Sequence, residues 1–231
     1  MTRTGTCGCS FYFYNPFMNF IDRVICEIDT GLRVVFAPAH AERPLPVSKE
    51  GIARNSAAMP IHSHEIKEAA RLMRVNHTGE VCAQALYQGQ ALIARTLATH
   101  NLLLHAAREE HDHLAWCEAR LDGLGGVTSR LNPLFYAGAF SLGVASGLMG
   151  DKWSMGFLVE TERQVETHLG DHLHRWPPAD HASRAVLTAM QADETRHAQA
   201  GLDHGGAALP APIQAAMRAF SRVMTATSYW V

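Results

Sequence analysis

The sequence predicts an all-α protein whose core is an antiparallel four-helix bundle. Apolar residues recur at helical spacing in nearly every segment between turn residues, and no run alternates as a half-buried strand would. A pair of helices, the first with a lone glutamate and the second with Glu-x-x-His, occurs twice along the chain. The 231 residues suffice for one substantial domain or two small ones, and two similar halves with a longer connection favour a single bundle.

The N-terminal half is expected to contain three helices. An amphipathic helix covers Phe20 to Phe36, and a linker from Ala37 to Val47 leads to polar residues up to about Pro60. A long helix follows from about Ser63 to Thr99, with Glu80 near its middle. The apolar side of the first helix consists of Ile21, Val24, Ile25, Ile28, Leu32 and Val35.

The first Glu-x-x-His lies on a helix from about Asn101 to Leu124, which Gly125-Gly126 closes. Asn132-Pro133 then opens an uncharged segment, since proline is favoured at the first helical position. This segment, Leu131 to Gly150, is diluted by glycine and serine, so a buried or membrane-surface helix is expected rather than a membrane-spanning one. Ala139, Gly143 and Gly147 give it the four-residue spacing of small residues that permits close helix contact.

Three helices complete the chain. Trp153 to Trp176 is stopped by Pro177-Pro178, and His181 to His204 is closed by Gly205-Gly206. The last helix starts at Pro210 or Pro212 and ends near Ser228. The apolar side of this helix consists of Ile213, Ala216, Met217, Phe220, Val223 and Met224. This side and the aromatic residues at the end of the helix suit a membrane surface, but an ordinary helix that covers the bundle is an equally good interpretation.

The two Glu-x-x-His copies, Glu110–His113 and Glu194–His197, predict a metal site. Positions i and i+3 share a helix face, so each copy presents a carboxylate and an imidazole to one point. One helix upstream of each copy, Glu80 and Glu162 lie on apolar stripes, as the glutamates of the two copies do. A buried carboxylate is costly unless a cation offsets it. Four carboxylates and two imidazoles favour two iron or manganese ions over zinc.

Nearby residues leave alternatives open. Glu160 shares a face with polar residues and is expected to be solvated, whereas Glu166 is a candidate alternate or supporting ligand. His77 has ligand spacing to Glu80, although a hydrogen-bonding or packing role is the favoured interpretation. Asp193 and Glu109 are candidate acceptors for the ligand histidines, or surface groups. No catalytic residue beyond the six ligands is predicted.

Composition excludes several classes of protein. Lysine and arginine total 20 against 22 acidic residues, so no basic excess attracts nucleic acid. Five cysteines at irregular spacing predict reduced thiols, and the aromatic N-terminus has no signal-peptide pattern. Most of the 14 histidines, including His62, His64, His172 and His174, are expected on solvated faces.

Several long segments closely resemble the bacterial demethoxyubiquinone hydroxylases of ubiquinone biosynthesis. They are residues 72–90 (LMRVNHTGEVCAQALYQGQ), 110–114 (EHDHL), 150–154 (GDKWS), 160–165 (ETERQV), 193–197 (DETRH) and 224–229 (MTATSY). The resemblance covers roughly residues 20 to 231. It implies a ferritin-like bundle in which the six ligand positions are Glu80, Glu110, His113, Glu162, Glu194 and His197. By analogy, Glu110 and Glu194 bridge two irons, which Glu80 with His113 and Glu162 with His197 complete.

The resemblance also implies a reaction. Two ferrous ions activate dioxygen, and the ring of a polyprenylated methoxy-methyl-benzoquinol is hydroxylated, with electrons from NADH. The long isoprenoid tail implies peripheral attachment to the cytoplasmic side of the cell membrane. Other ubiquinone-biosynthesis proteins or a second copy of the chain are candidate partners. No G-x-G-x-x-G fingerprint offers a dedicated nicotinamide domain.

Residues 1–17 fall outside the resemblance. Because Met18 directly precedes the matching helix, one interpretation is that the start site is set too early, and the other is that the extension is real. The expected organisation is therefore this extension, an N-terminal helix and linker over 18–60, and the di-iron domain with its C-terminal membrane-surface helix over 61–231. Two other functions remain open at this point: a ferritin-like ferroxidase or peroxidase, and a non-enzymatic quinone-binding helper protein.

Overall fold

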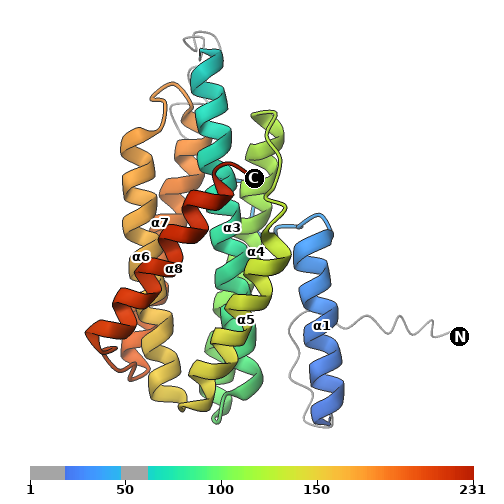
Figure 1. Cartoon of the computed structure of the whole chain (residues 1–231), viewed down its shortest axis with the longest axis vertical. Coiled ribbons are helices and arrows are strands. Elements are labelled where there is room, and N and C mark those ends of the chain that lie inside the picture. The colour runs from blue at the N-terminus through green and yellow to red at the C-terminus, as the bar shows by residue number, and fades with distance from the viewer. Residues whose placement is uncertain (1–18, 48–61) are drawn as a thin grey trace, which may run out of the picture.

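The computed structural model describes residues 19–47 and 62–231, and within these ranges all regular elements are helices. Four of them form the bundle: α3 (Ser63–Ile93), α4 (Leu97–Gly123), α6 (Asp151–Arg175) and α7 (His181–Asp203). Helices α3 and α4 make one antiparallel pair and α6 and α7 the other, as Figure 1 shows. The predicted all-α bundle of two helix pairs is confirmed. The predicted extension, residues 1–17, and the polar residues 48–60 that follow the linker lie outside the described residues.

Three further helices surround the bundle. Helix α5 (Asn132–Leu148) connects the two pairs and packs along α3, and α8 (Ala211–Ser228) crosses over α3 and α6 (Figure 1). Helix α1 (Phe20–Phe36) lies beside α3 and α5. The outer helices therefore cover the α3 side of the bundle.

Local signals explain where most helices begin. Asn19 accepts a hydrogen bond from the backbone N–H of Asp22, and Asp180 does the same for Ser183, as helix N-caps do. Before α6, Gly150 adopts a φ of +104°, a left-handed conformation that glycine allows without strain.

The boundary between α3 and α4 was predicted wrongly. The sequence suggested a helix continuing to Thr99, but α3 ends at Ile93 and α4 begins at Leu97. Thr96 caps α4, and the carboxylate of Asp151 accepts hydrogen bonds from the backbone N–H groups of Arg95 and Thr96. A residue distant in sequence thus fixes a break that no glycine or proline marks.

The backbones of α3 and α5 lie in direct contact, as the small-residue spacing predicted. A Cβ added to Gly143 would lie 2.2 Å from the carbonyl oxygen of Leu86, and one added to Gly89 would lie 2.3 Å from that of Phe140. Neither position has room for a side chain, so the approach of the two helices depends on glycine.

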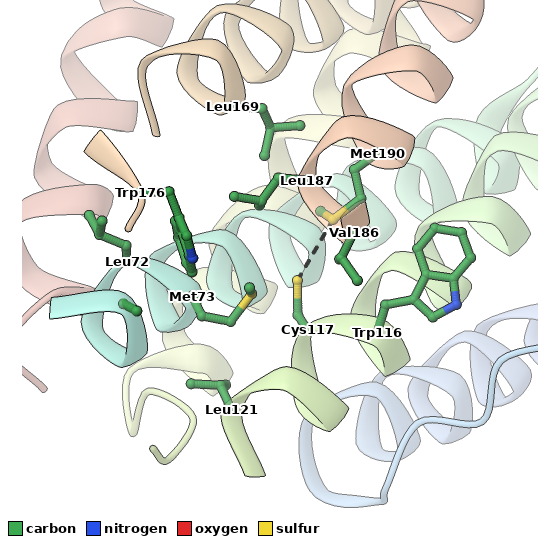
Figure 2. Packing of buried hydrophobic residues seen from close by; sticks show 11 residues of the cluster. Leu72, Met73, Trp116, Cys117, Leu121, Leu169, Trp176, Val186, Leu187 and Met190 are labelled. Carbon is green, nitrogen blue, oxygen red and sulfur yellow. Dashed lines mark hydrogen bonds between the residues drawn. The ribbon is translucent and has the colours of Figure 1, made fainter. Parts of the chain in front are cut away.

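Two apolar clusters fill the bundle at different heights. One gathers Met73, Trp116, Cys117, Leu169 and Met190 from the four bundle helices, as Figure 2 shows. The other gathers residues of α3, α4 and α6, including Ala83, Tyr87, Leu103 and Leu158. Glu80, Glu110 and Glu162 lie between these two clusters along their helices.

Helix α1 presents an apolar side to the exterior. The side chains of Ile21, Ile25, Ile28, Leu32 and Phe36 are 55–71% exposed. Among the described residues, no helix is both long and apolar enough to cross a membrane.

Candidate metal centre

The six predicted ligand residues meet at the centre of the bundle. They form two overlapping groups whose potential ligand atoms lie within 4.8 Å of one another, and every member is buried. One group contains Glu80 and His113, and the other contains Glu162 and His197. Glu110 and Glu194 belong to both groups. Either group could hold a metal ion.

The Nδ1 atom of each histidine faces three carboxylates. His113 Nδ1 lies 3.1 Å from Glu110, 3.3 Å from Glu194 and 3.6 Å from Glu80. His197 Nδ1 lies 3.2 Å from Glu110, 3.3 Å from Glu162 and 3.5 Å from Glu194. The shared glutamates thus stand between the two imidazoles, whose ring centroids are 6.4 Å apart. Glu110 and Glu194 would therefore be shared between two ions if each group held one.

The Nε2 atoms point away from the cluster to carboxylates on the opposite helix. His113 on α4 lies 3.0 Å from Asp193 on α7, and His197 on α7 lies 2.6 Å from Glu109 on α4. Hydrogen bonds of this kind fix the tautomer and ring orientation of metal-bound histidines. Asp193 and Glu109 were predicted to be either acceptors for the ligand histidines or surface groups, and these contacts match the acceptor role.

Arg43 braces this outer layer from the linker between α1 and α3. Its guanidinium donates to Asp112 at 2.6 Å and to Asp193 at 2.7 Å, and it lies 3.6 Å from Glu109. It also stacks over the Trp116 ring at 4.7 Å. Local sequence spacing does not indicate Arg43, because its partners lie about 70 or more residues away in the chain.

Tyr87 is the second residue that the sequence analysis did not assign to the site. Its hydroxyl donates to Glu162 at 2.5 Å, and the side chain is fully buried. The position, seven residues after Glu80 on the same face of α3, was a usable signal. Tyr87 therefore donates a hydrogen bond to the cluster from the apolar core of the bundle.

Burial and mutual charge separate the four glutamates into two kinds. Burial raises the pKa of Glu80 and of Glu162 well above the ordinary value, and neighbouring glutamate charges add to the rise. Burial also opposes ionisation of Glu110, but the adjacent imidazoles of His113 and His197 outweigh it and lower its pKa. Burial and the charge of Glu110 oppose ionisation of Glu194, but the same two imidazoles outweigh them and lower its pKa. The outer and the shared glutamates thus differ in the direction of their pKa shifts.

The donor set fits a pair of divalent cations. Five buried atoms of the cluster have no hydrogen-bond partner in the part of the chain that the structure describes: Glu110 Oε1, Glu162 Oε2, both carboxylate oxygens of Glu194 and His197 Nδ1. Buried polar atoms are rarely left unpaired, because each costs roughly 1–3 kcal/mol. Four carboxylates with two neutral imidazoles balance two divalent ions, so metal binding would satisfy both the unpaired atoms and the charge.

Three alternatives from the sequence lie outside the cluster. His77 contacts Glu118 at 3.4 Å and Asn132 at 3.3 Å, which matches the hydrogen-bonding role. Glu166 accepts a hydrogen bond from Thr195, and Glu160 accepts one from Gln164. None of the three belongs to either candidate metal group.

An apolar cavity of about 620 Å³ reaches the cluster at Glu80. Its walls come from α3, α5, α6 and α8, and they include Leu86, Phe157, Met217 and Phe220. Most of the apolar side of α8 lines this cavity. A smaller opening of about 100 Å³ reaches His197 between α4, α6 and α7 and is lined by polar groups such as Glu109 and Arg196.

A helical bundle with two such glutamate–histidine groups has the architecture of the ferritin-like carboxylate proteins, in which a Glu from each of two helices joins Glu-x-x-His from the other two. Within that class, the chain belongs to the family described as ubiquinone biosynthesis protein COQ7, whose model matches residues 67–228.

Curated relatives extend the match beyond the family region. The 3-demethoxyubiquinol 3-hydroxylase of Polynucleobacter necessarius is 54% identical over 212 residues, which are 92% of this chain and 99% of the relative. Those of Chromobacterium violaceum and Nitrosomonas europaea are 53% and 52% identical over 211 residues, covering 91% of this chain and 100% and 99% of the relatives. The family resemblance predicted from the motifs is confirmed.

Proposed function

We propose that the protein is a di-iron monooxygenase that hydroxylates the ring of a polyprenylated demethoxyubiquinol in ubiquinone biosynthesis. The observation that carries this proposal is the large apolar cavity that ends at Glu80, one of the glutamates of the candidate metal centre. The names of the relatives, 3-demethoxyubiquinol 3-hydroxylase, support the same reaction. Dioxygen is the co-substrate, and NADH is the proposed source of electrons.

Two irons would be held by the six residues of the cluster. Glu110 and Glu194 would be shared, while His113 with Glu80 and His197 with Glu162 would each serve one ion. When bound, the irons supply the reduction of dioxygen and the transfer of one oxygen atom to the ring. Asp193 and Glu109 hold the ligand histidines by their Nε2 atoms, so that Nδ1 faces the irons.

The cavity walls have two tasks in this reaction. Side chains of α3, α6 and α8 surround the quinol ring with apolar atoms and keep bulk water from the metals. Exclusion of water strengthens the electrostatic contacts inside the site and limits side reactions. A cavity of about 620 Å³ lies in the range of ligand sites. Ferroxidase or peroxidase chemistry acts on ions and small oxygen species and needs no such chamber, which favours hydroxylation of an organic substrate.

We also propose that the protein attaches peripherally to the cytoplasmic face of the cell membrane. The cavity wall includes Leu142, Met149 and Phe220, which are also exposed, so the mouth has an apolar rim. Val223 and Trp230 add exposed apolar surface on and beside α8. A lipid-dissolved tail would enter through such a rim. Flotation with phospholipid vesicles tests the attachment, and protein that stays at the bottom of the gradient would contradict it.

The decisive assay of the reaction uses iron-loaded protein, NADH, isotopically labelled dioxygen and a short-tailed demethoxyubiquinol. We expect a product heavier by one labelled oxygen atom, detected by mass spectrometry, and none from the Glu110→Ala variant. Peroxide turnover or iron accumulation without this product would favour the ferroxidase. In cells, ubiquinone synthesis that persists with Glu110→Ala would favour the non-enzymatic helper.

A further inference from the structure

Gly79 stands out among the glycines of the bundle. It lies inside α3, directly before Glu80, and its φ is not positive, so the backbone does not require glycine. A Cβ added there would meet no heavy atom within 4 Å, whereas one added to Gly89 or Gly143 would meet backbone. A glycine in a helix interior costs about 0.5–1 kcal/mol relative to alanine. Neither backbone conformation nor packing explains why residue 79 is a glycine.

The empty space beside Gly79 belongs to the apolar cavity. Gly79 and Glu80 both line the cavity wall, so the missing side chain leaves room next to a residue of the candidate metal centre. A planar ring can approach α3 closely at this point. A side chain there would fill space that the protein itself leaves unused.

Asn76 is a polar residue in the wall of the same cavity. It is 3% exposed, and neither atom of its side-chain amide has a hydrogen-bond partner among residues 19–47 and 62–231. It precedes Glu80 by one helical turn, so the two residues share a face of α3. The axial separation of the two residues is about 6 Å at 1.5 Å per residue, comparable with the width of a substituted six-membered ring. A buried amide with both atoms unpaired indicates a missing partner that both donates and accepts.

We propose that Gly79 and Asn76 position the aromatic ring of the substrate: the ring lies against the gap at Gly79, and a quinol hydroxyl exchanges hydrogen bonds with the Asn76 amide. A phenolic hydroxyl is both donor and acceptor, so it can use both amide atoms, which a methoxy group cannot. The pair then holds the ring carbon to be hydroxylated next to Glu80 and its metal. This inference rests on the proposed hydroxylase function and adds the residues that select and orient the substrate.

The test at Gly79 adds a side chain without disturbing the fold. In iron-loaded Gly79→Val, we expect a thermal midpoint and iron content within error of the wild type. Product formation with a short-tailed demethoxyubiquinol should fall at least tenfold, while NADH oxidation becomes uncoupled and releases hydrogen peroxide. The matched control is Gly138→Val on α5, another helical glycine whose added Cβ meets nothing within 4 Å, but which does not line the cavity. Equal turnover and coupling in the two variants would overturn the proposal.

The test at Asn76 measures specificity. Asn76→Leu removes both hydrogen bonds of the amide, and one neutral hydrogen bond corresponds to about 3- to 10-fold in affinity. We therefore expect KM for the quinol to rise at least about threefold, with a smaller change in kcat. The variant should also lose discrimination between the quinol and an analogue whose hydroxyl is methylated, and Asn76→Asp should restore part of it. An unchanged preference in Asn76→Leu would contradict the proposed contact. If the wild type itself gives no hydroxylated product, the proposed function fails. If the wild type gives the product and both variants match it in turnover, coupling and specificity, this inference alone fails.

Discussion

The glutamate–histidine cluster has ionised, paired side chains on one side and neutral side chains on the other. On the ionic side, formed by Arg43, Glu109, Asp112, Asp193 and Arg196, charges are paired. The hydrogen bond from His197 lowers the pKa of Glu109 to about 2, and contacts with His113 and both arginines outweigh burial and lower that of Asp193. This side keeps its carboxylates ionised.

On the cavity side, formed by the apolar walls from α3, α5, α6 and α8, groups are kept neutral. Burial lowers the pKa of His168 to about 4 and raises that of Cys82 to about 12. Both residues line the cavity. One side therefore fixes the metal ligands through charged hydrogen bonds, while the other offers an uncharged space to an apolar substrate. Two different tasks meet at one cluster.

The largest effect is expected where the two sides join. Glu110 belongs to both metal groups, so Glu110→Ala should reduce bound iron from two atoms to none and abolish hydroxylation. Elemental analysis of reconstituted protein measures the loss. The control is Glu160→Ala, on α6 but bonded to Gln164 rather than to the cluster, which should retain both irons. Equal iron content in the two variants would refute the shared role of Glu110.

The brace on the ionic side is expected to have the next largest effect. Arg43→Met would leave nearly buried Asp112 without its main charged partner and would leave Asp193 with only His113 and Arg196. Breaking a fully buried pair costs about 3–5 kcal/mol. Because the Arg43 side chain is 32% exposed, we expect a loss of about 2–3 kcal/mol in the free energy of unfolding. Urea denaturation measures it. Arg175→Met, which removes an exposed pair with Glu68, should cost less than about 1 kcal/mol. Similar losses of unfolding free energy in both variants would show that Arg43 does not stabilise the ionic side.

The sequence was informative where function depends on local spacing. Glu-x-x-His places its two side chains on one helix face in any α-helix, which named four of the cluster residues before the structure. The apolar stripes around Glu80 and Glu162, together with the family resemblance, named the other two. Arg43 could not be named, because its partners Asp112 and Asp193 become neighbours only after the linker folds across α4 and α7. The α3–α4 break depends likewise on the distant Asp151.

His172 shows a different kind of error. The sequence analysis placed it on a solvated face, but it is buried and its ring neighbours His168 and Trp176. Its spacing of three residues from Leu169 and four from Trp176 puts it on the apolar side of α6. Residue type was given more weight than periodicity, and the prediction was wrong for that reason.

A pH titration tests whether His172, whose ring neighbours that of the cavity residue His168, is also neutral. Burial lowers the pKa of His172 to about 2, below the ordinary 6.5, so the unfolded chain binds the proton first as the pH falls. The stability contributed by neutral His172 is therefore present above about pH 6.5 and lost below it. Between pH 7 and pH 5, metal-free wild type should lose about 2 kcal/mol more than His172→Phe in urea denaturation. Parallel losses in the two proteins would contradict a neutral, buried His172.

The smallest effect is expected at Tyr87, which donates to Glu162 from within the apolar core. Tyr87→Phe should keep both irons bound but weaken iron affinity by about tenfold, roughly 1.4 kcal/mol, as loss of an outer hydrogen bond to a ligand does. Competition with a chelator measures the change. An affinity equal to that of the wild type would show that Glu162 needs no such donor.

We expect the cluster to bind two irons between its ionic side and the apolar cavity. Anomalous diffraction at the iron edge, on crystals of iron-loaded protein, locates them. Two iron peaks should lie next to Glu110 and Glu194, one ligated by His113 Nδ1 and the other by His197 Nδ1. A single peak, or iron bound through the Nε2 atoms that face Asp193 and Glu109, would rule out this two-iron site.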